Sequence, residues 1–343
     1  MTRVVLWGLG SMGSGMAKIL LQKEGIEIVG AIAKRESKRG KDLGEVLGIE
    51  DNLDVIVHND AAEVLEKAAG DIILHATNSF VKESFSELKL AMEAGYNVIT
   101  IAEEMAYPVA QEPEYTERLD RLARENGVTI LGTGINPGFI LDTLIIAMTG
   151  VCADVKRIKA SRINDLSPFG PTVMKTQGVG TTVEEFAEGV KEGNIVGHIG
   201  FPESINMIAD SLGWELDEII QTREPIITNV KRETPHVKVE PGMVAGCKHI
   251  AHGMKDGEKI ITLEHPQQIH PELEGTETGD YIKIEGTPAV NLAITPEIPG
   301  GIGTMAVAIN MVPRVIAAGP GLVTMKDLPL PAAIMGDMRK LIK

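Results

Sequence analysis

Short apolar runs alternate with amphipathic segments over the first 133 residues or so. The apolar runs have the length and continuity of buried strands: residues 4–7, 26–33, 55–57, 72–76, 97–101 and 128–131. The intervening segments with helical character are residues 16–21, 61–69, 83–94 and 112–126. Strands that alternate with helices at this spacing predict a doubly wound parallel sheet of the Rossmann type.

The pattern changes beyond this region. Residues 155–163 predict a longer strand, and residues 183–192 and 202–212 predict helices. Strand-like runs follow at residues 226–230, 243–251, 259–264, 281–285 and 289–294, and the apolar stretch 302–318 predicts a helix. Clustered helices and strands favour an α+β domain with a mostly antiparallel sheet. We expect a dinucleotide-binding domain at 1–135, a substrate-binding and dimerisation domain at 136–300, and a C-terminal helix and tail, 301–343, that packs on the first domain.

Composition narrows the class of protein. The 343 residues are 43% hydrophobic and 24% charged, which is typical of a globular protein with about two domains. The net charge of −15 disfavours nucleic acid or an anionic membrane as the main partner. Cys152 and Cys247 are too few for a disulfide framework or a four-cysteine zinc site. We find no run of about 18 apolar residues and no signal-peptide pattern, so we expect a cytoplasmic protein without a structural metal.

A glycine-rich segment lies between the first predicted strand and the first helix. It has the G-x-G-x-x-G spacing of dinucleotide-binding proteins, in which the glycines permit a tight turn, close approach of the pyrophosphate, and helix–strand packing. We expect its backbone and the helix N-terminus to bind the cofactor phosphates. A glycine turn without a ligand is the alternative. The predicted cofactor-binding residues are Gly8, Gly10, Ser11, Met12 and Gly13.

The end of the second predicted strand bears on the choice of cofactor. No acid stands at its tip, and Lys34, Arg35 and Ser37 follow at once. Arg35, with Lys34 or Ser37, would suit a 2′-phosphate, which favours NADP over NAD. NAD stays open because Glu36 would serve a ribose, and a solvated basic loop is the alternative without function. Thr77 follows the fourth strand, where it would contact the nicotinamide ribose, cap the next helix, or do both.

Two adjacent carboxylates are the candidate catalytic groups. Glu103 and Glu104 come just after the fifth predicted strand, at the end that faces the nicotinamide in this fold. Burial of one of them would raise its pKa and suit it to proton transfer. The alternative is an acidic helix start that the helix dipole stabilises.

Polar residues further along are candidates for ligand contacts. Asn136, in the glycine-rich crossover after the sixth strand, would hold the nicotinamide carboxamide or serve as a turn residue. Arg162 and Asn164, two apart on a strand, share one face and would suit a substrate carboxylate. His265 ends another strand and is either a substrate ligand or a structural histidine.

Several segments together resemble the 2,4-diaminopentanoate dehydrogenase family, which is related to native amine dehydrogenases and to dihydrodipicolinate reductases. They are the glycine-rich loop and residues 101–105, 134–138, 161–165 and 287–291. The resemblance implies NAD(P)-dependent oxidative deamination of 2,4-diaminopentanoate at C4, a step of ornithine catabolism. It also implies that Glu103 and Glu104 jointly contain the acid–base group, that Arg162, Asn164 and His265 bind the amino-acid end, and that Asn136 lies near the nicotinamide.

Other functions stay open from the sequence. The paired-histidine, lysine and Ser-Gly-Thr pattern of dihydrodipicolinate reductases has no match, which argues against that reaction. A cyclic-imine reductase, an enzyme similar to meso-diaminopimelate dehydrogenase, and a catalytically silent NADP sensor are the alternatives. We expect a small diamino-acid substrate and a homodimer.

Overall fold

The computed structural model describes residues 1–342. The chain divides into two compact units. Unit 1 comprises Met1–Phe139 together with the C-terminal residues from Pro299, and unit 2 comprises Ile140–Ile298.

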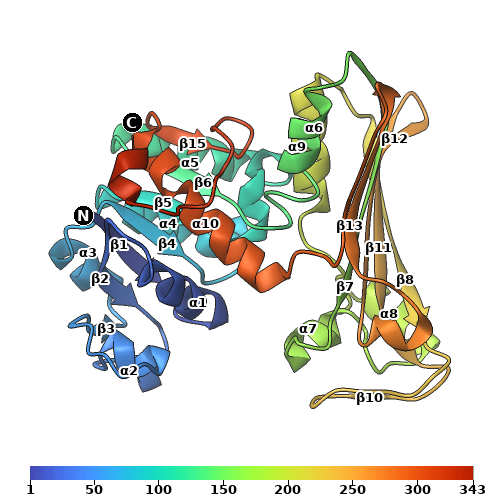
Figure 1. Ribbon diagram of the computed structural model, residues 1–343, viewed down its shortest axis with the longest axis horizontal. Helices are drawn as coiled ribbons and strands as arrows, with labels where there is room; N and C mark the ends of the chain where they lie inside the picture. Colours follow the sequence, from blue (N-terminus) through green and yellow to red (C-terminus); the bar gives the residue numbers. More distant parts are fainter. Residues whose placement is uncertain (343) are drawn as a thin grey trace. The chain divides into compact units, whose positions relative to one another are not determined.

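Unit 1 is built on a seven-stranded sheet whose paired strands all run parallel (Figure 1). The strand order is β15-β6-β5-β4-β1-β2-β3. This sheet confirms the predicted Rossmann-type domain. The strands are β1 (Thr2–Trp7), β2 (Ile26–Ile32), β3 (Val57–His58), β4 (Ile72–His75), β5 (Asn97–Thr100), β6 (Thr129–Gly132) and β15 (Gly321–Val323).

Helices cover both faces of this sheet, which explains why its strands are apolar throughout. In β1, Val4 and Leu6 pack into the apolar cluster on one face, while Val5 and Trp7 pack into the cluster on the other. The helices are α1 (Ser11–Leu20), α2 (Leu43–Leu47), α3 (Ala61–Lys67), α4 (Val81–Glu93), α5 (Pro113–Glu125) and α10 (Gly300–Ala317). Short 3-10 turns are η1 (Glu36–Lys38), η2 (Glu103–Ala106), η3 (Pro108–Ala110) and η5 (Met338–Leu341).

The helix α10 meets the length and hydropathy expected of a membrane span, alone among the described helices. No such segment is expected from the sequence analysis. Its buried side chains, among them Val307, Met311 and Val312, belong to the same apolar cluster as Val4 and Leu6 of β1. The helix is therefore apolar because it forms part of the core of unit 1.

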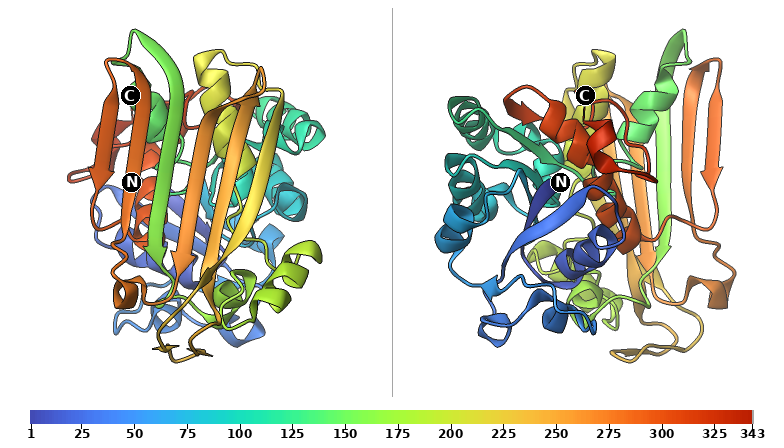
Figure 2. Two further views of the ribbon diagram at one scale, coloured as in Figure 1. Left: turned by 90° about the vertical axis from the view of Figure 1, so that its right-hand side faces the viewer. Right: turned by 60° about the vertical axis from the view of Figure 1, so that its left-hand side comes forward.

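Unit 2 contains a six-stranded sheet of order β14-β13-β7-β12-β11-β8. Only the β7–β12 pair is parallel among these strands, so the prediction of a mostly antiparallel sheet is confirmed. Figure 2 shows, in its left view, one face of this sheet that no helix of the described chain covers. The strands are β7 (Asp154–Asp165), β8 (Glu218–Ile227), β11 (Val244–Lys255), β12 (Glu258–Gln268), β13 (Gly279–Thr287) and β14 (Val290–Ile294).

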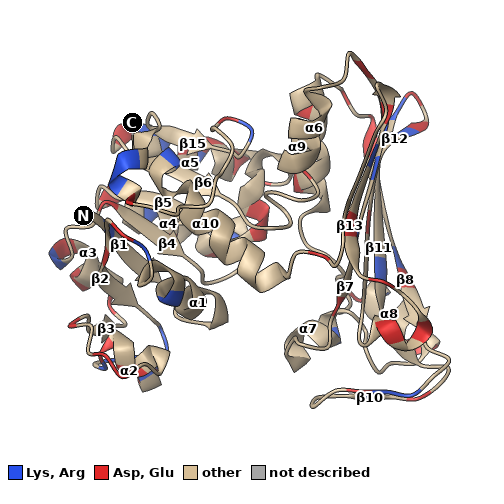
Figure 3. Cartoon of the chain, in the orientation of Figure 1, with Lys and Arg blue, Asp and Glu red and all other residues tan. Residues whose placement is uncertain are grey.

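Short helices complete unit 2: α6 (Thr143–Thr149), α7 (Pro171–Thr176), α8 (Val183–Lys191), α9 (Phe201–Leu212) and the 3-10 turn η4 (Pro271–Glu274). The first turn of α8 is acidic and begins with a capping box, in which Thr182 and Glu185 bind each other's backbone amides. Figure 3 shows that both basic and acidic residues occur on the strands of the six-stranded sheet. A separate two-stranded ribbon pairs β9 (Arg232–Glu233) with β10 (Lys238–Val239).

The strand predicted at residues 226–230 is wrong in its bounds, because β8 spans Glu218–Ile227. Intermediate and exposed positions alternate along β8, and it carries Arg223, Glu224 and Pro225. An apolar run is therefore a poor marker for it. The strand β15 is also absent from the sequence prediction, since three residues beside a long helix leave no periodic signal.

Candidate active site

The glycine-rich loop joins β1 to α1 in unit 1. Gly8 has a φ of +99°, and a Cβ on it would lie 2.2 Å from a backbone carbonyl oxygen in the segment after β4. A Cβ at Gly13 would lie 1.7 Å from the Gly8 carbonyl oxygen, so both positions require glycine. Gly10 is the N-cap of α1, Ser11 and Met12 are its first residues, and no side chain within residues 1–342 caps this turn. The first N–H groups of α1 are thus suited to phosphate oxygens.

The residues after β2 form an exposed basic segment whose side chains differ in their contacts. Lys34, Arg35 and Ser37 are all exposed. Lys34 Nζ lies 2.6 Å from Oε1 of Glu87 in α4, so its charge is already paired. Lys38, which the sequence analysis did not single out, is half-buried and donates to a backbone carbonyl of the glycine-rich loop. Its ammonium therefore lies beside the segment predicted to hold the pyrophosphate.

The segment after β4 is tied to the same carboxylate. Thr77 Oγ1 donates to Glu87 Oε2 at 2.7 Å, and His75 Nε2 lies 2.8 Å from that oxygen. His75 Nδ1 lies 2.9 Å from Thr100 Oγ1. Burial opposes ionisation of Glu87, but the hydrogen bonds from His75, Lys34 and Thr77 prevail and lower its pKa to about 2.

The two candidate carboxylates lie in the 3-10 turn η2 and have different partners. Glu104 Oε2 accepts the backbone N–H of Val81, the first residue of α4, at 2.8 Å. Burial raises the pKa of Glu103 against hydrogen bonds from its own backbone amide and from Ser79, and the Glu104 carboxylate raises it further. Burial also raises the pKa of Glu104, while the Val81 hydrogen bond lowers it. Both carboxyl groups thus have a raised pKa, as proton transfer requires, and Glu104 differs in that it also accepts the first amide of α4.

Asn136 lies in the crossover after β6, next to the start of α10. The backbone N–H of Ile135 donates to Thr304 Oγ1 of α10 at 3.1 Å. Gly138 has a φ of +123°, and a Cβ there would lie 2.4 Å from the Gly134 backbone nitrogen. The crossover is therefore held tightly, and the contact of Asn136 with the nicotinamide stays a prediction.

In unit 2, the predicted substrate residues lie on the same face of the sheet. Arg162 and Asn164 alternate with less buried positions along β7, and Asn164 Oδ1 lies 2.8 Å from Nε2 of His265 in β12. Arg162 Nη1 lies 2.5 Å from Asp280 Oδ1 of β13, and its Nη2 donates to the Ile298 carbonyl oxygen. The side chains of Arg162 and Asp280 are only 3% and 1% exposed. The structure thus gives Arg162 an anionic partner that the sequence did not suggest.

Two further histidines extend this polar cluster. The His198 ring lies 4.8 Å from that of His265 and 4.7 Å from Phe201. The His198 backbone N–H donates to His249 Nδ1 at 3.0 Å, so a neutral His249 carries its proton on Nε2. Burial lowers the pKa of His249 to about 3, aided by the charge of Arg223. Burial also lowers the pKa of His198 and His265, and the neighbouring imidazoles and Arg162 add to the effect. The three imidazoles are therefore neutral near pH 7.

The sequence contains a turn pattern that predicts how two of these histidines come together. Asp256-Gly257 is a two-residue turn pattern that predicts a hairpin, and both residues have positive φ. The hairpin of β11 and β12 places His249 opposite His265.

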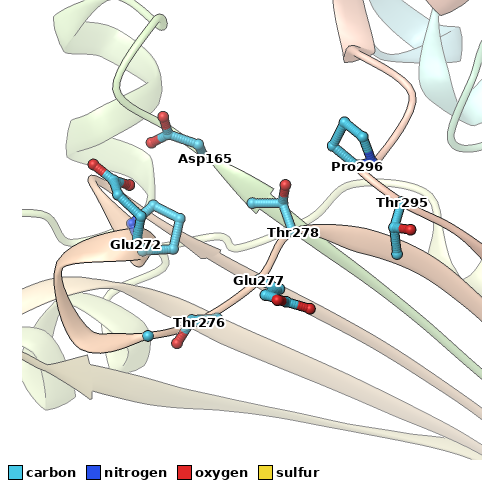
Figure 4. Close-up of a pocket in the computed structure, with 9 residues that line it drawn as sticks. Asp165, Glu272, Thr276, Glu277, Thr278, Thr295 and Pro296 are labelled. Atoms are coloured by element: carbon cyan, nitrogen blue, oxygen red, sulfur yellow. The ribbon is translucent and has the colours of Figure 1, made fainter.

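A cavity in unit 2 has a volume of about 670 Å³ and an acidic lining (Figure 4). Asp165, Glu272 and Glu277 contribute its carboxylates. Arg162, Asn164 and His265 do not line it. Asp165 Oδ1 already accepts hydrogen bonds from the backbone amides of Ser167 and His270, so this side chain stabilises its own loop.

The fold and these side chains define a class of protein. A Rossmann-type unit with a dinucleotide loop is joined to an α+β unit with a buried polar cluster, which is the organisation of an NAD(P)-binding dehydrogenase. The N-terminal residues 2–101 match the family described as dihydrodipicolinate reductase, N-terminus. Residues 139–343 match the family described as 2,4-diaminopentanoate dehydrogenase C-terminal domain.

Individual proteins agree with these matches. The chain is 52% identical to the 2,4-diaminopentanoate dehydrogenase of Acetoanaerobium sticklandii, over 99% of this chain and 97% of that protein. The solved structure of an amine dehydrogenase from Mycobacterium smegmatis is 32% identical and superimposes with a TM-score of 0.85, over 96% of this chain and 97% of that one. A dihydrodipicolinate reductase from Paenisporosarcina, solved with bound dipicolinate, shares the fold. It is 13% identical and superimposes with a TM-score of 0.53, over 94% of this chain and 97% of that one. The chain belongs to the 2,4-diaminopentanoate dehydrogenase family and is an oxidoreductase related to amine dehydrogenases.

Proposed function

We propose that this protein catalyses the NAD(P)-dependent oxidative deamination of 2,4-diaminopentanoate at C4, which yields 2-amino-4-oxopentanoate and ammonia. The observation that carries the proposal is Glu103, a carboxyl group with a raised pKa just beyond the carboxyl end of β5, in a member of this family. In a Rossmann-type sheet that end borders the ligand crevice.

The chemistry requires a group that gains and loses protons near neutral pH. The C4 ammonium of the substrate must lose one proton, because only the neutral amine has the lone pair that assists departure of the hydride from C4. Glu103 accepts that proton. The bound nicotinamide supplies the acceptor for the hydride. Glu103 passes that proton to solvent before water adds to the resulting iminium. It then removes a proton from the added water and transfers it to the nitrogen of the carbinolamine. The C4–N bond breaks, ammonia departs, and loss of the hydroxyl proton leaves the C4 ketone.

The residues of unit 1 fit a dinucleotide. The glycine-rich loop and the first turn of α1 bind its phosphates, and Lys38 adds a positive charge beside that loop. We propose that Arg35 and Ser37, with a contribution from Lys34, bind a 2′-phosphate, so that NADP is preferred and NAD is also accepted. Asn136 would hold the nicotinamide carboxamide, and Thr77 the adjoining ribose.

The residues of unit 2 supply the contacts for the amino-acid end of the substrate. We assign Asn164 and His265 as direct contacts, because their polar atoms meet within 2.8 Å on a buried sheet face. Arg162 attracts the substrate carboxylate, and Asp280 holds the Arg162 guanidinium in place. With the imidazoles neutral and Arg162 paired, the cluster has no net charge, which suits the zwitterionic end of an amino acid. A cytoplasmic homodimer, associated through the uncovered face of the six-stranded sheet, completes the proposal.

Separate variants of the adjacent carboxylates test the catalytic assignment. Glu103→Gln is expected to lower kcat by about 10²- to 10⁴-fold, the usual contribution of a general acid–base group, while the Kd for NADPH stays unchanged. Glu104→Gln is the matched control, since the amide oxygen still accepts the Val81 N–H, and it is expected to retain most of the turnover.

Two results would contradict the assignment. If Glu104→Gln loses turnover and Glu103→Gln keeps it, the roles of the two carboxylates are reversed. If both single variants and the double variant deaminate the substrate normally, proton transfer occurs elsewhere.

A further inference from the structure

Glu87 contacts two segments of the predicted cofactor site, the one after β2 and the one after β4. It lies in α4, and only 8% of its side chain is exposed. Its Oε1 pairs with Lys34, two residues beyond β2. Its Oε2 accepts the Thr77 hydroxyl and lies 2.8 Å from His75 Nε2, at the end of β4. The two carboxylate oxygens therefore have separate partners, one in the segment after β2 and the others at the end of β4 and just beyond it.

We propose that Glu87 determines how strongly the enzyme prefers NADP over NAD, by neutralising Lys34. Lys34 is 79% exposed at the tip of β2, where a 2′-phosphate would lie. To bind that phosphate, its ammonium must give up or share the contact with Glu87 at 2.6 Å. Glu87 weakens the attraction of this segment for a 2′-phosphate and leaves NAD, which lacks the phosphate, unaffected. The inference rests on the proposed position of the cofactor.

Glu87 cannot follow Lys34 towards solvent. Its carboxylate is fixed by Thr77 and His75, and the His75 ring is fixed in turn by Thr100. Its carboxylate therefore remains available to pair with the Lys34 ammonium whichever cofactor binds. An exposed lysine with a fixed acidic partner favours a 2′-phosphate less than a lysine without one.

The isosteric change Glu87→Gln separates the charge from the hydrogen bonds. The amide oxygen takes the place of Oε2 and still accepts from Thr77 and His75, while the amide nitrogen takes the place of Oε1 and no longer attracts Lys34. Dissociation constants for NADPH and NADH are measured by fluorescence titration of the purified enzyme without substrate. We expect the ratio of the NADH Kd to the NADPH Kd to rise by up to about fivefold, the range of an exposed ion pair.

Matched variants test whether Lys34 transmits the effect. Lys34→Gln should lower the ratio, and Glu87→Gln added to Lys34→Gln should change it no further. Glu93→Gln, which removes a carboxylate from the last turn of α4, should leave the ratio as it is. Thr77→Val should weaken both cofactors to the same extent, because it loosens the segment after β4 without changing charge.

The proposal is overturned if Glu87→Gln leaves the ratio unchanged, or if its effect persists in the Lys34→Gln background. Should Glu87→Gln fail to fold, an unchanged ratio in Lys34→Gln alone overturns it. These outcomes are distinct from failure of the proposed function. A wild-type ratio below one would contradict the NADP preference, and absence of turnover with 2,4-diaminopentanoate would contradict the substrate, but neither changes the titration of the variants.

Discussion

The buried ion pair between Arg162 and Asp280 permits a quantitative prediction. Arg162→Met removes the cation and leaves the carboxylate in a site where its side chain is 1% exposed. An uncompensated buried charge of this kind costs about 3–5 kcal/mol in the free energy of unfolding. Replacing both partners, as Arg162→Met with Asp280→Leu, removes the stranded charge and should cost much less.

The loss of stability should depend on pH. Burial raises the pKa of Asp280 above its ordinary value, and Arg162 opposes that rise. Without Arg162 the folded-state pKa rises further. A carboxyl group with a raised folded-state pKa favours the folded protein while it is protonated. The loss in free energy of unfolding caused by Arg162→Met should therefore be smallest below the ordinary pKa of an aspartate. It should grow as the pH rises through the raised folded-state pKa of Asp280.

Chemical denaturation of wild type, both single variants and the double variant, from pH 4 to pH 8, measures these effects. Arg157→Met is the control on the same strand, because its side chain is 46% exposed and its ion pairs lie at the surface. The reasoning is refuted if Arg162→Met is no more destabilising than Arg157→Met, or if its deficit shrinks as the pH rises. A double variant that folds but has a raised KM for substrate, with an unchanged Kd for NADPH, would support the contact of Arg162 with the substrate.

Three further predictions follow from single side chains. Glu104→Ala removes the acceptor for the Val81 N–H and should lower the free energy of unfolding by about 1 kcal/mol, as measured by denaturation; an unchanged value would show that the cap contributes nothing. Burial raises the pKa of the Cys247 thiol to about 12, so alkylation of the native protein at pH 8 should modify Cys152 first. Peptide mass mapping measures the order of labelling, and rapid labelling of Cys247 would contradict its burial. Lys38→Met should weaken NADPH and NADH alike by roughly 1 kcal/mol in fluorescence titrations, since it removes a charge beside the phosphate-binding loop; a loss confined to NADPH would place it at the 2′-phosphate instead.

The sequence predicts the fold where a strand is buried on both faces and therefore forms a continuous apolar run. The strands β1, β2, β4, β5 and β6 are covered on both faces, so their apolar runs identify them. The predictions fail where tertiary pairing alone defines the element. Gly321–Val323 is a strand because it pairs with β6, and β8 is a strand because it pairs with β11 despite its charges.

The candidate site shows a similar limit. Position at the end of β5 makes Glu103 and Glu104 candidates for proton transfer, but only the fold shows that Glu104 accepts the first amide of α4. Lys34 stood in the expected place for a 2′-phosphate, yet its partner Glu87 is 53 residues away, in the middle of a helix. No local pattern links such residues, because the contact depends on how α4 packs on the sheet.

The most direct test of the central claim is the initial rate of NADP or NAD reduction with 2,4-diaminopentanoate, beside ornithine, lysine and meso-diaminopimelate. We predict rapid turnover with 2,4-diaminopentanoate alone, release of one ammonia for each NAD(P)H formed, and a higher kcat/KM with NADP. Turnover with a different diamino acid would contradict the proposed substrate and leave the proton-transfer mechanism in place. Tight cofactor binding without turnover of any of the four would contradict the account as a whole.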